Sequence, residues 1–373
     1  MRGIVHGGDG VHVSFPFFPP SAILHVPNLQ CRAPTTGGQY HWVSEFAPPS
    51  SQRFLSYLVG WLCVLGWQVG NVAVAFLTAQ QIQGLIILNN LETYTPQRWH
   101  LTLLVIAIET ACQLLNTVWY RALPLLETLA LILHLGGFFA VLGPLWASEG
   151  FRTRATSSPG EVFFTFTDGG GWGNTALSCL VGMVSPLFGL IGPDSAGHMA
   201  EELRNASKSL PRAMISTMLA NGALGLVSIV TFCMTMGGDV EDVEGILATP
   251  TTQPFIQVFF NATGSKVGTT LMTCVMVVMA ACGVVNNIAT SSRQLWAFAR
   301  DKGVPFSSWF ANVHPGMGLP VNALIFSYGL AVALSLINIG STIVSFFPCF
   351  FLLFSLLGVI PGRVYVPREG VLT

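Results

Sequence analysis

Residues 186–194 combine helix-weakening side chains with a carboxylate, and they are where this chain could do chemistry. The cluster consists of Pro186, Gly189, Gly192, Pro193 and Asp194, and apolar runs flank it at 176–184 and 213–236. Proline removes a backbone donor and clashes with the preceding turn, and glycine adds backbone freedom. We therefore expect a membrane helix that breaks here, which is tolerated only where protein or a water-filled cavity covers the freed backbone.

The chemistry expected at this break is the binding of a small charged solute. Freed peptide groups at broken helices are what secondary transporters use to hold substrates and ions. Carbonyls ending the upstream half suit an ammonium group, and amides opening the downstream half suit a carboxylate. The peptide groups of 188–193 are thus candidates for holding a zwitterion. Asp194 could bind a substrate ammonium, bind a coupling cation, or hold the break by bonding to its neighbours.

The composition places the whole chain in a membrane. Charged residues make up 9% of the 373 residues, against roughly 25% in soluble proteins, while apolar residues reach 51% and the mean hydropathy is +0.61. The net charge of -1 argues against a nucleic-acid partner. The eight cysteines are scattered without a CxxC pair, so we expect small packed side chains rather than disulfides, and neither a metal nor a cofactor.

The apolar runs predict an all-α membrane protein of about eight transmembrane helices. A helix needs about 20 residues to span the hydrocarbon core. We expect an irregular segment at 1–36, a transmembrane domain at 37–360 and a short cytoplasmic tail at 361–373. The predicted spans are 54–88, 100–119, 123–146, an interrupted one over 176–202, 213–236, 267–290, 319–339 and 341–359.

Ionisable residues inside the spans have two possible roles. Glu109 lies within the second span and His134 within the third. An ionisable group at such a depth is a functional candidate by default. The alternative, that each is bonded to a neighbouring helix, stays open.

The distribution of Lys and Arg predicts the orientation. Cytoplasmic loops carry the excess of these residues. The loops on one side of the predicted spans hold ten of them, and the loops on the other side hold four. The acidic stretch 237–265, with its glycosylation pattern at Asn261, falls on the poor side. The rich set is Arg53, Arg121, Arg204, Lys208, Arg212, Arg293, Arg300, Lys302, Arg363 and Arg368; the poor set is Arg98, Arg152, Arg154 and Lys266.

Two charged stretches lie at the predicted cytoplasmic end. Residues 201–212 are either a salt-bridged gate or an ordinary solvated loop. Residues 293–302 place Arg293, Trp296 and Arg300 at helical spacings, which predicts an interfacial helix against anionic lipid or against the first stretch.

The sequence does not favour an enzyme. Its eight histidines are dispersed and form no HExxH or HxxxxD pattern. The one local cluster is His198 with Asp194, Glu201 and Glu202, and no second histidine or nucleophile lies nearby. No catalytic residues are therefore predicted.

Three stretches resemble fungal permeases of the amino acid–polyamine–organocation superfamily, in the branch of choline, GABA and other amino-acid permeases. They are IGPDSAGHMAEE at 191–202 with NASKSLPRAM at 205–214, GGQYHWVSEF at 37–46, and SSRQLWAFARDKGVPF at 291–306. The resemblance covers roughly 36–342.

The resemblance implies a leucine-transporter-type fold with substrate held at broken helices. By it, the substrate-binding segment maps onto Phe188, Gly189, Ile191, Gly192, Pro193 and Asp194. It implies a multi-pass permease of the plasma membrane or an internal membrane such as the vacuole. An amino acid or amine such as choline or GABA would be the substrate, with a proton as a possible coupling partner.

The chain departs from this family pattern in its number of helices. Members normally carry about twelve, and the eight predicted spans correspond to the third through tenth. We expect the first two and the last two to be missing, so a transport-inactive or regulatory permease remnant is the alternative function.

Overall fold

The computed structural model describes residues 35–147, 163, 166, 168, 171–182, 192–203, 205–236 and 245–341, and every regular element in these ranges is helical. The elements are α3 (Gln39–Phe46), α4 (Gln52–Asn89), α5 (Arg98–Thr117), η2 (Tyr120–Ala122), α6 (Leu123–Ala147), α9 (Thr175–Gly182), η3 (Pro193–Glu202), α11 (Ala206–Thr235), α13 (Pro254–Thr263), α14 (Lys266–Arg300), α15 (Ser307–Phe310) and α16 (Val321–Gly340).

Six helices in the described part are long and apolar enough to cross a bilayer: α4, α5, α6 with η2, α11, α14 and α16. The all-α membrane class predicted from composition is therefore confirmed. In the fourth predicted span, the interrupted one over 176–202, the described residues form the short elements α9 and η3. The eighth predicted span, 341–359, lies outside the described residues apart from Ser341, as do the segment 1–34 and the tail.

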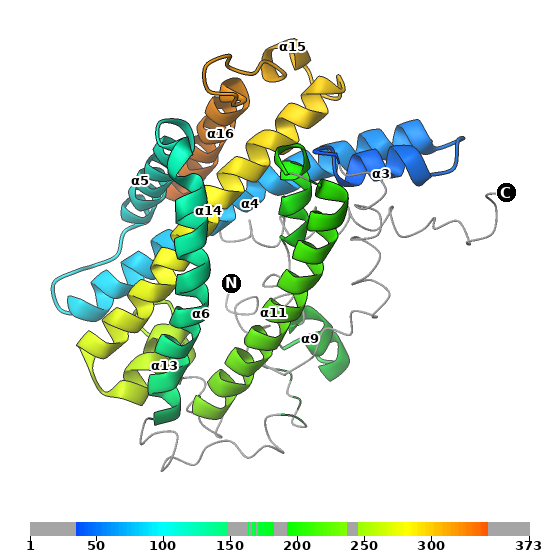
Figure 1. The fold of residues 1–373 in the computed structure, drawn as a ribbon. Coiled ribbons are helices and arrows are strands. Elements are labelled where there is room, and N and C mark those ends of the chain that lie inside the picture. The colour runs from blue at the N-terminus through cyan, green and yellow to red at the C-terminus, as the bar shows by residue number, and fades with distance from the viewer. Residues whose placement is uncertain are drawn as a thin grey trace.

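The helices α4 and α14 form the centre of the bundle (Figure 1). They contain 38 and 35 residues, so at 1.5 Å per residue each is longer than the roughly 30 Å hydrocarbon core. Most of α4 is buried, whereas few residues of α11 are fully buried. The helices α5 and α16 pack beside the central pair, while α6 and α13 pack against α14.

Three apolar clusters hold these contacts. The largest joins α4, α5, α14 and α16 through residues such as Phe76, Val105 and Ile288. A second joins α3 and α4 to the end of α14, centred on Phe298. A third joins α6, α13 and α14. Burying one large apolar side chain fully stabilises a fold by roughly 1.5–3 kcal/mol relative to leaving it exposed to water.

Several helix boundaries differ from the prediction. The sixth predicted span continues as α14 to Arg300 rather than ending near 290. The hydroxyl groups of Ser291 and Ser292 bond back to carbonyls three residues earlier, so the polar run does not stop the helix. Likewise α11 begins at Ala206 instead of 213, and the acidic stretch contains the helix α13. A polar run can mark where a helix leaves the membrane while the helix itself continues.

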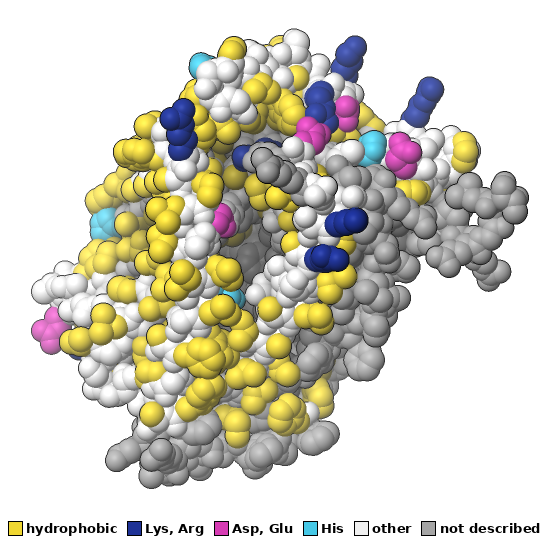
Figure 2. All heavy atoms as spheres, in the orientation of Figure 1, with side chains coloured by type: hydrophobic (Ala, Val, Ile, Leu, Met, Phe, Trp, Pro, Cys, Tyr) yellow, Lys and Arg dark blue, Asp and Glu magenta, His cyan; other side chains and the backbone are white. Residues whose placement is uncertain are grey.

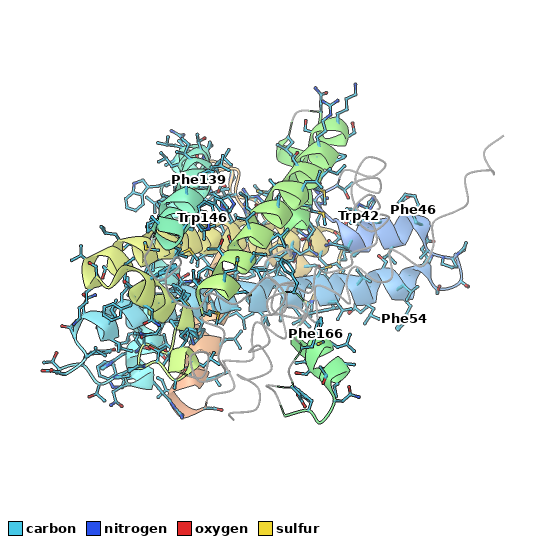
Figure 3. All side chains as sticks on the ribbon, turned by 90° about the horizontal axis from the view of Figure 1, so that it is seen from below. Trp42, Phe46, Phe54, Phe139, Trp146 and Phe166 are labelled. Carbon is cyan, nitrogen blue, oxygen red and sulfur yellow. The ribbon has the colours of Figure 1, made fainter. Side chains whose placement is uncertain are left out.

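The outer surface is apolar along the spans and charged near one end. In Figure 2, Lys, Arg, Asp and Glu side chains gather mainly toward the upper part of the molecule, whereas hydrophobic side chains dominate below. Phe54 and Phe139 are 68% and 63% exposed and point away from the bundle in Figure 3. Such exposed apolar surface suits lipid and would be costly in water.

Candidate functional site

The described residues cover the downstream end of the predicted break, from Gly192 onward. Gly192, directly before η3, has φ 116°, in the left-handed region that favours glycine, and Pro193 opens the element. The described part of 175–202 is thus not one continuous α-helix. Gly192 and Asp194 lie at the start of η3 as predicted, while Phe188, Gly189 and Ile191 lie outside the described residues.

The downstream half is a 3₁₀ helix rather than the α-helix that the sequence suggested. Ser195 donates its backbone N–H to the carbonyl of Gly192 at 2.9 Å, three residues earlier. Asp194, Ser195 and Gly197 are weak α-helix formers, so local preference does not impose an α-helix here. A 3₁₀ stretch of this length is uncommon and often marks a hinge or a sequence under strain.

Asp194 is fixed by a residue far away in the sequence. The side-chain amide of Gln39, at the start of α3, donates to its Oδ2 at 2.6 Å. The pair is partly buried, and Gln39 itself is 5% exposed. Because Gln39 is neutral, this bond orients the carboxylate without neutralising its charge.

His198 is enclosed by the segment that precedes α3. Its side chain is fully buried, and its Nδ1 lies 3.0 Å from the carbonyl oxygen of Thr36. A carbonyl only accepts, so Nδ1 carries the hydrogen and Nε2 is the acceptor, which has no protein partner in the described part. The ring of Trp67 on α4 meets the imidazole edge-on, with ring centroids 5.7 Å apart.

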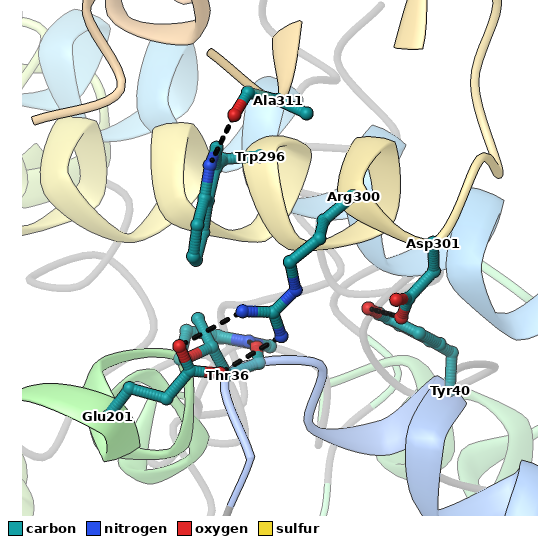
Figure 4. Close-up of polar contacts among 8 residues, drawn as sticks. Thr36, Tyr40, Glu201, Trp296, Arg300, Asp301 and Ala311 are labelled. Atoms are coloured by element: carbon teal, nitrogen blue, oxygen red, sulfur yellow. Dashed lines mark hydrogen bonds and ion pairs between the residues drawn. The ribbon is translucent and has the colours of Figure 1, made fainter. Parts of the chain in front are cut away.

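A second set of contacts joins η3 to the end of α14 (Figure 4). Arg300 donates through Nη1 and Nη2 to the two carboxylate oxygens of Glu201, each at 3.0 Å. Its guanidinium also lies 4.7 Å from the ring centroid of Trp296. We call this pair, Glu201 and Arg300, the η3–α14 clasp. Planar bidentate pairing is the strongest geometry for such a contact.

Residues in and beside the clasp shift the pKa values of Glu201 and Tyr40. The hydrogen bonds from Arg300 are the main cause that holds the pKa of Glu201 below its usual value, and Thr36 adds hydrogen bonds of its own. Beside them, the hydroxyl of Tyr40 donates to Asp301 at 2.8 Å. Burial and then the Asp301 charge raise the pKa of Tyr40 well above its usual range. The phenol therefore stays protonated and keeps donating.

The sequence pointed to the break but not to what holds it. Gln39, Thr36 and Trp67 contact η3 from positions more than 130 residues away in the chain. The paired glycines at 37 and 38, within a stretch otherwise rich in aromatic residues, were the only local signal. Of the two charged stretches, the alternative in which 293–302 lies against 201–202 is supported by the clasp.

The remaining ionisable candidates are also placed. Glu109 is fully buried in α5 and accepts from Asn71. His134 lies in α6 with its Nε2 unpaired among the described residues. In those same residues no group of three His, Cys, Asp or Glu side chains is arranged to hold a metal ion.

Six apolar helices of bilayer length in the described part define a multi-pass integral membrane protein. Residues 29–364 match the family model described as amino acid permease. That match covers most of the chain, and the chain belongs to the amino acid permease family.

Three fungal relatives illustrate the similarity. One from Macrophomina phaseolina (strain MS6), whose name provisionally assigns it to amino acid and polyamine transport, is 31% identical over 86% of this chain and 69% of its own length. The choline transporter of Saccharomyces cerevisiae is 27% identical over 84% of this chain and 54% of its own length. The GABA-specific permease of the same yeast is 23% identical over 78% and 50%. The chain thus spans about half the length of the two yeast relatives.

Proposed function

We propose that this chain is a secondary active transporter, not an enzyme, for amino acids or related amines such as choline or GABA. Access to the solute would alternate across the membrane around the interrupted helix. The observation that carries the proposal is the left-handed Gly192 immediately before η3, where the helix stops being continuous and its peptide groups become free to bind a solute. Family membership supports the same class of substrate.

The solute would contact the segment comprising Phe188, Gly189, Ile191, Gly192, Pro193 and Asp194. Carbonyls upstream of the break suit its ammonium group, and the start of η3 suits its carboxylate. Asp194 has one oxygen engaged by Gln39, so it can hold the break, and its other oxygen can serve a solute or a coupling ion. Holding the break and contacting a solute or ion are roles that substitutions can distinguish.

The η3–α14 clasp would form part of the cytoplasmic closure. It joins η3, which carries the site, to α14, which spans the bilayer and ends at Arg300. Its side chains are 42% and 41% exposed, so the contact is weak enough to open and close during a cycle. The plasma membrane is the proposed location, with the vacuolar membrane as the alternative.

Uptake of radiolabelled solutes tests the function. The full chain is expressed in cells lacking their own amino acid and choline permeases, and its insertion is verified. Choline, GABA and a panel of amino acids are offered, and saturable uptake of at least one is expected. Inserted protein that neither binds nor imports any of them would contradict the proposal and favour a transport-inactive permease.

Two variants separate the roles of Asp194. In Asp194→Asn the amide oxygen still accepts from Gln39, so geometry is retained and charge is lost. In Gln39→Met the donor is lost and the charge is retained. If Asp194 contacts the solute or ion, the first variant loses uptake while its thermal stability is kept. If it only holds the break, the second variant loses both and the first is nearly unaffected. Glu92→Gln, at an exposed loop position, is the control.

A further inference from the structure

Glu109 is a buried carboxyl at mid-membrane depth, and it takes no part in the contacts described around η3. It is the only acidic residue of α5 and is 0% exposed. It lies eleven positions after the first residue of this 20-residue helix, which places it about 16 Å along the helix, near the middle of a roughly 30 Å core. Residues of α4, α14 and α16 surround this part of α5.

Its hydrogen bonding is incomplete. The amide of Asn71 on α4 donates to Glu109 Oε2 at 3.3 Å, a long bond from a neutral donor. Glu109 Oε1 is buried and has no protein partner in the described part. An ionised carboxylate normally accepts several bonds, since it offers about four lone-pair sites.

No cation faces this carboxyl from the described elements packed against it. On its own helix the titratable neighbour is Cys112, and Cys282 of α14 lies beyond it. From α16 the nearest titratable group is Tyr328, whose hydroxyl bonds to Thr110 at 2.9 Å. From α4 the contact is the neutral Asn71. Neither ion pair found among the described residues involves Glu109.

This environment favours the carboxylic acid over the carboxylate. An unpaired ion in such a site costs several kcal/mol after relaxation, which a proton on the carboxyl avoids. The surroundings also have an excess of acceptors, since Asn71 Oδ1 and Gln113 Oε1 are buried with no donor among the described residues. An O–H group on Glu109 would reduce that excess, whereas a negative charge would aggravate it.

Buried polar side chains continue from Glu109 toward one side of the membrane. On α5, Gln113 and Asn116 follow at helical spacing, and both are buried. On α4, Gln68 lies one turn before Asn71 and donates to Ser327 Oγ at 2.8 Å. Both sets lead toward the ends of α4 and α5 that the Lys and Arg bias places in the cytoplasm.

We propose that Glu109 is a proton-binding site that couples solute movement to a proton gradient. The carboxylate takes up one proton on Oε1, forming the O–H bond held in this conformation. That bond breaks when water reaches the site and accepts the proton, which then leaves toward the cytoplasm through water lined by the polar side chains named above. The coupling role depends on the transport function proposed above; the binding of the proton does not.

Infrared spectroscopy of the full chain in liposomes tests proton binding directly. At neutral pH we expect the C=O band of a protonated carboxyl, shifted by deuterium exchange and absent in Glu109→Gln. The control Glu127→Gln, at an exposed position of α6, should retain the band. Asn71→Leu should shift it, because Oε2 loses its donor. Absence of the band in the wild type, its survival in Glu109→Gln, or its removal by sodium at constant pH would overturn the proposal.

Transport in the same liposomes tests the coupling. For one proton per solute, an inward gradient of about one pH unit drives about tenfold accumulation. We expect Glu109→Gln to lose this accumulation but to keep exchange of labelled for unlabelled solute, which needs no gradient. Unchanged accumulation in the variant would refute the coupling. If the wild type moves no solute at all, the transport function fails, and the infrared result still decides whether Glu109 binds a proton.

Discussion

Gly38 stands directly against the imidazole of His198. Its φ of 59° lies in the left-handed region, and a Cβ added to it would lie 2.8 Å from His198 Cε1. The two residues are 160 positions apart, and the ring that blocks the Cβ is fully buried. The close approach lets Thr36 and Gln39, on either side of the paired glycines, bond to His198 and Asp194 at the same time.

We expect Gly38→Ala to loosen this contact. The substitution combines an unfavourable left-handed backbone with overpacking against a buried ring, and the sum is about 2–4 kcal/mol. A lowered thermal midpoint in detergent is the readout. Gly136→Ala is the matched control, because nothing lies within 4 Å of its added Cβ in α6. That change should be neutral or stabilising by about 0.5–1 kcal/mol. Equal midpoints for the two variants would contradict the prediction.

The ring of Phe298 is enclosed by two glycines in the same way. Added Cβ atoms on Gly60 and Gly303 would lie 2.3 and 2.2 Å from its Cε2. Gly60→Ala should therefore destabilise the packing of α4 on α14 by about 1–3 kcal/mol. Adding Phe298→Leu should recover part of that loss, because the smaller side chain makes room. If the two changes are simply additive in thermal unfolding, the ring is not what excludes the methyl group.

The η3–α14 clasp should contribute little to stability. Both side chains are exposed by about two fifths, so a double-mutant cycle with Glu201→Gln and Arg300→Gln should give a coupling of about 0.2–1 kcal/mol. A coupling of several kcal/mol would mean that the pair is a structural anchor rather than a contact able to open.

The coupling should also depend on pH in a defined direction. Arg300 lowers the pKa of Glu201 in the folded protein, so the carboxylate stabilises the fold at pH values above its unfolded pKa of about 4.3. That contribution is lost as the pH falls through the lowered folded pKa. Repeating the cycle between neutral and strongly acidic pH should show a constant coupling that vanishes only below about pH 4. A loss near neutral pH would contradict this.

Two glycosylation tripeptides test the orientation of the chain. Asn261, in α13, lies on the predicted outer side, whereas Asn205, in an Asn-Ala-Ser tripeptide before α11, lies on the predicted cytoplasmic side. Both side chains are exposed. In a secretory-pathway host we expect a glycan that Asn261→Gln removes and Asn205→Gln leaves in place. The opposite pattern would invert the predicted topology.

The membrane class and the break could be predicted because both depend on local sequence. Hydropathy over about 20 residues identifies a span, and α5, α6 and α16 begin and end within about two residues of their predicted positions. Gly192 and Pro193 mark the break by their own backbone restrictions. The end of α14 was misplaced because membrane exit and helix termination are different events: the first follows polarity, the second follows hydrogen bonding.

The contacts of η3, α14 and α5 with distant residues were decided by the tertiary structure alone. Gln39 meets Asp194, Arg300 meets Glu201, and Asn71 reaches Glu109 only because packed helices bring distant turns together. Hydropathy says that each side chain sits in or near the membrane, but it does not say which other helix it faces. That depends on helix crossing and rotation, which are set by packing throughout the bundle.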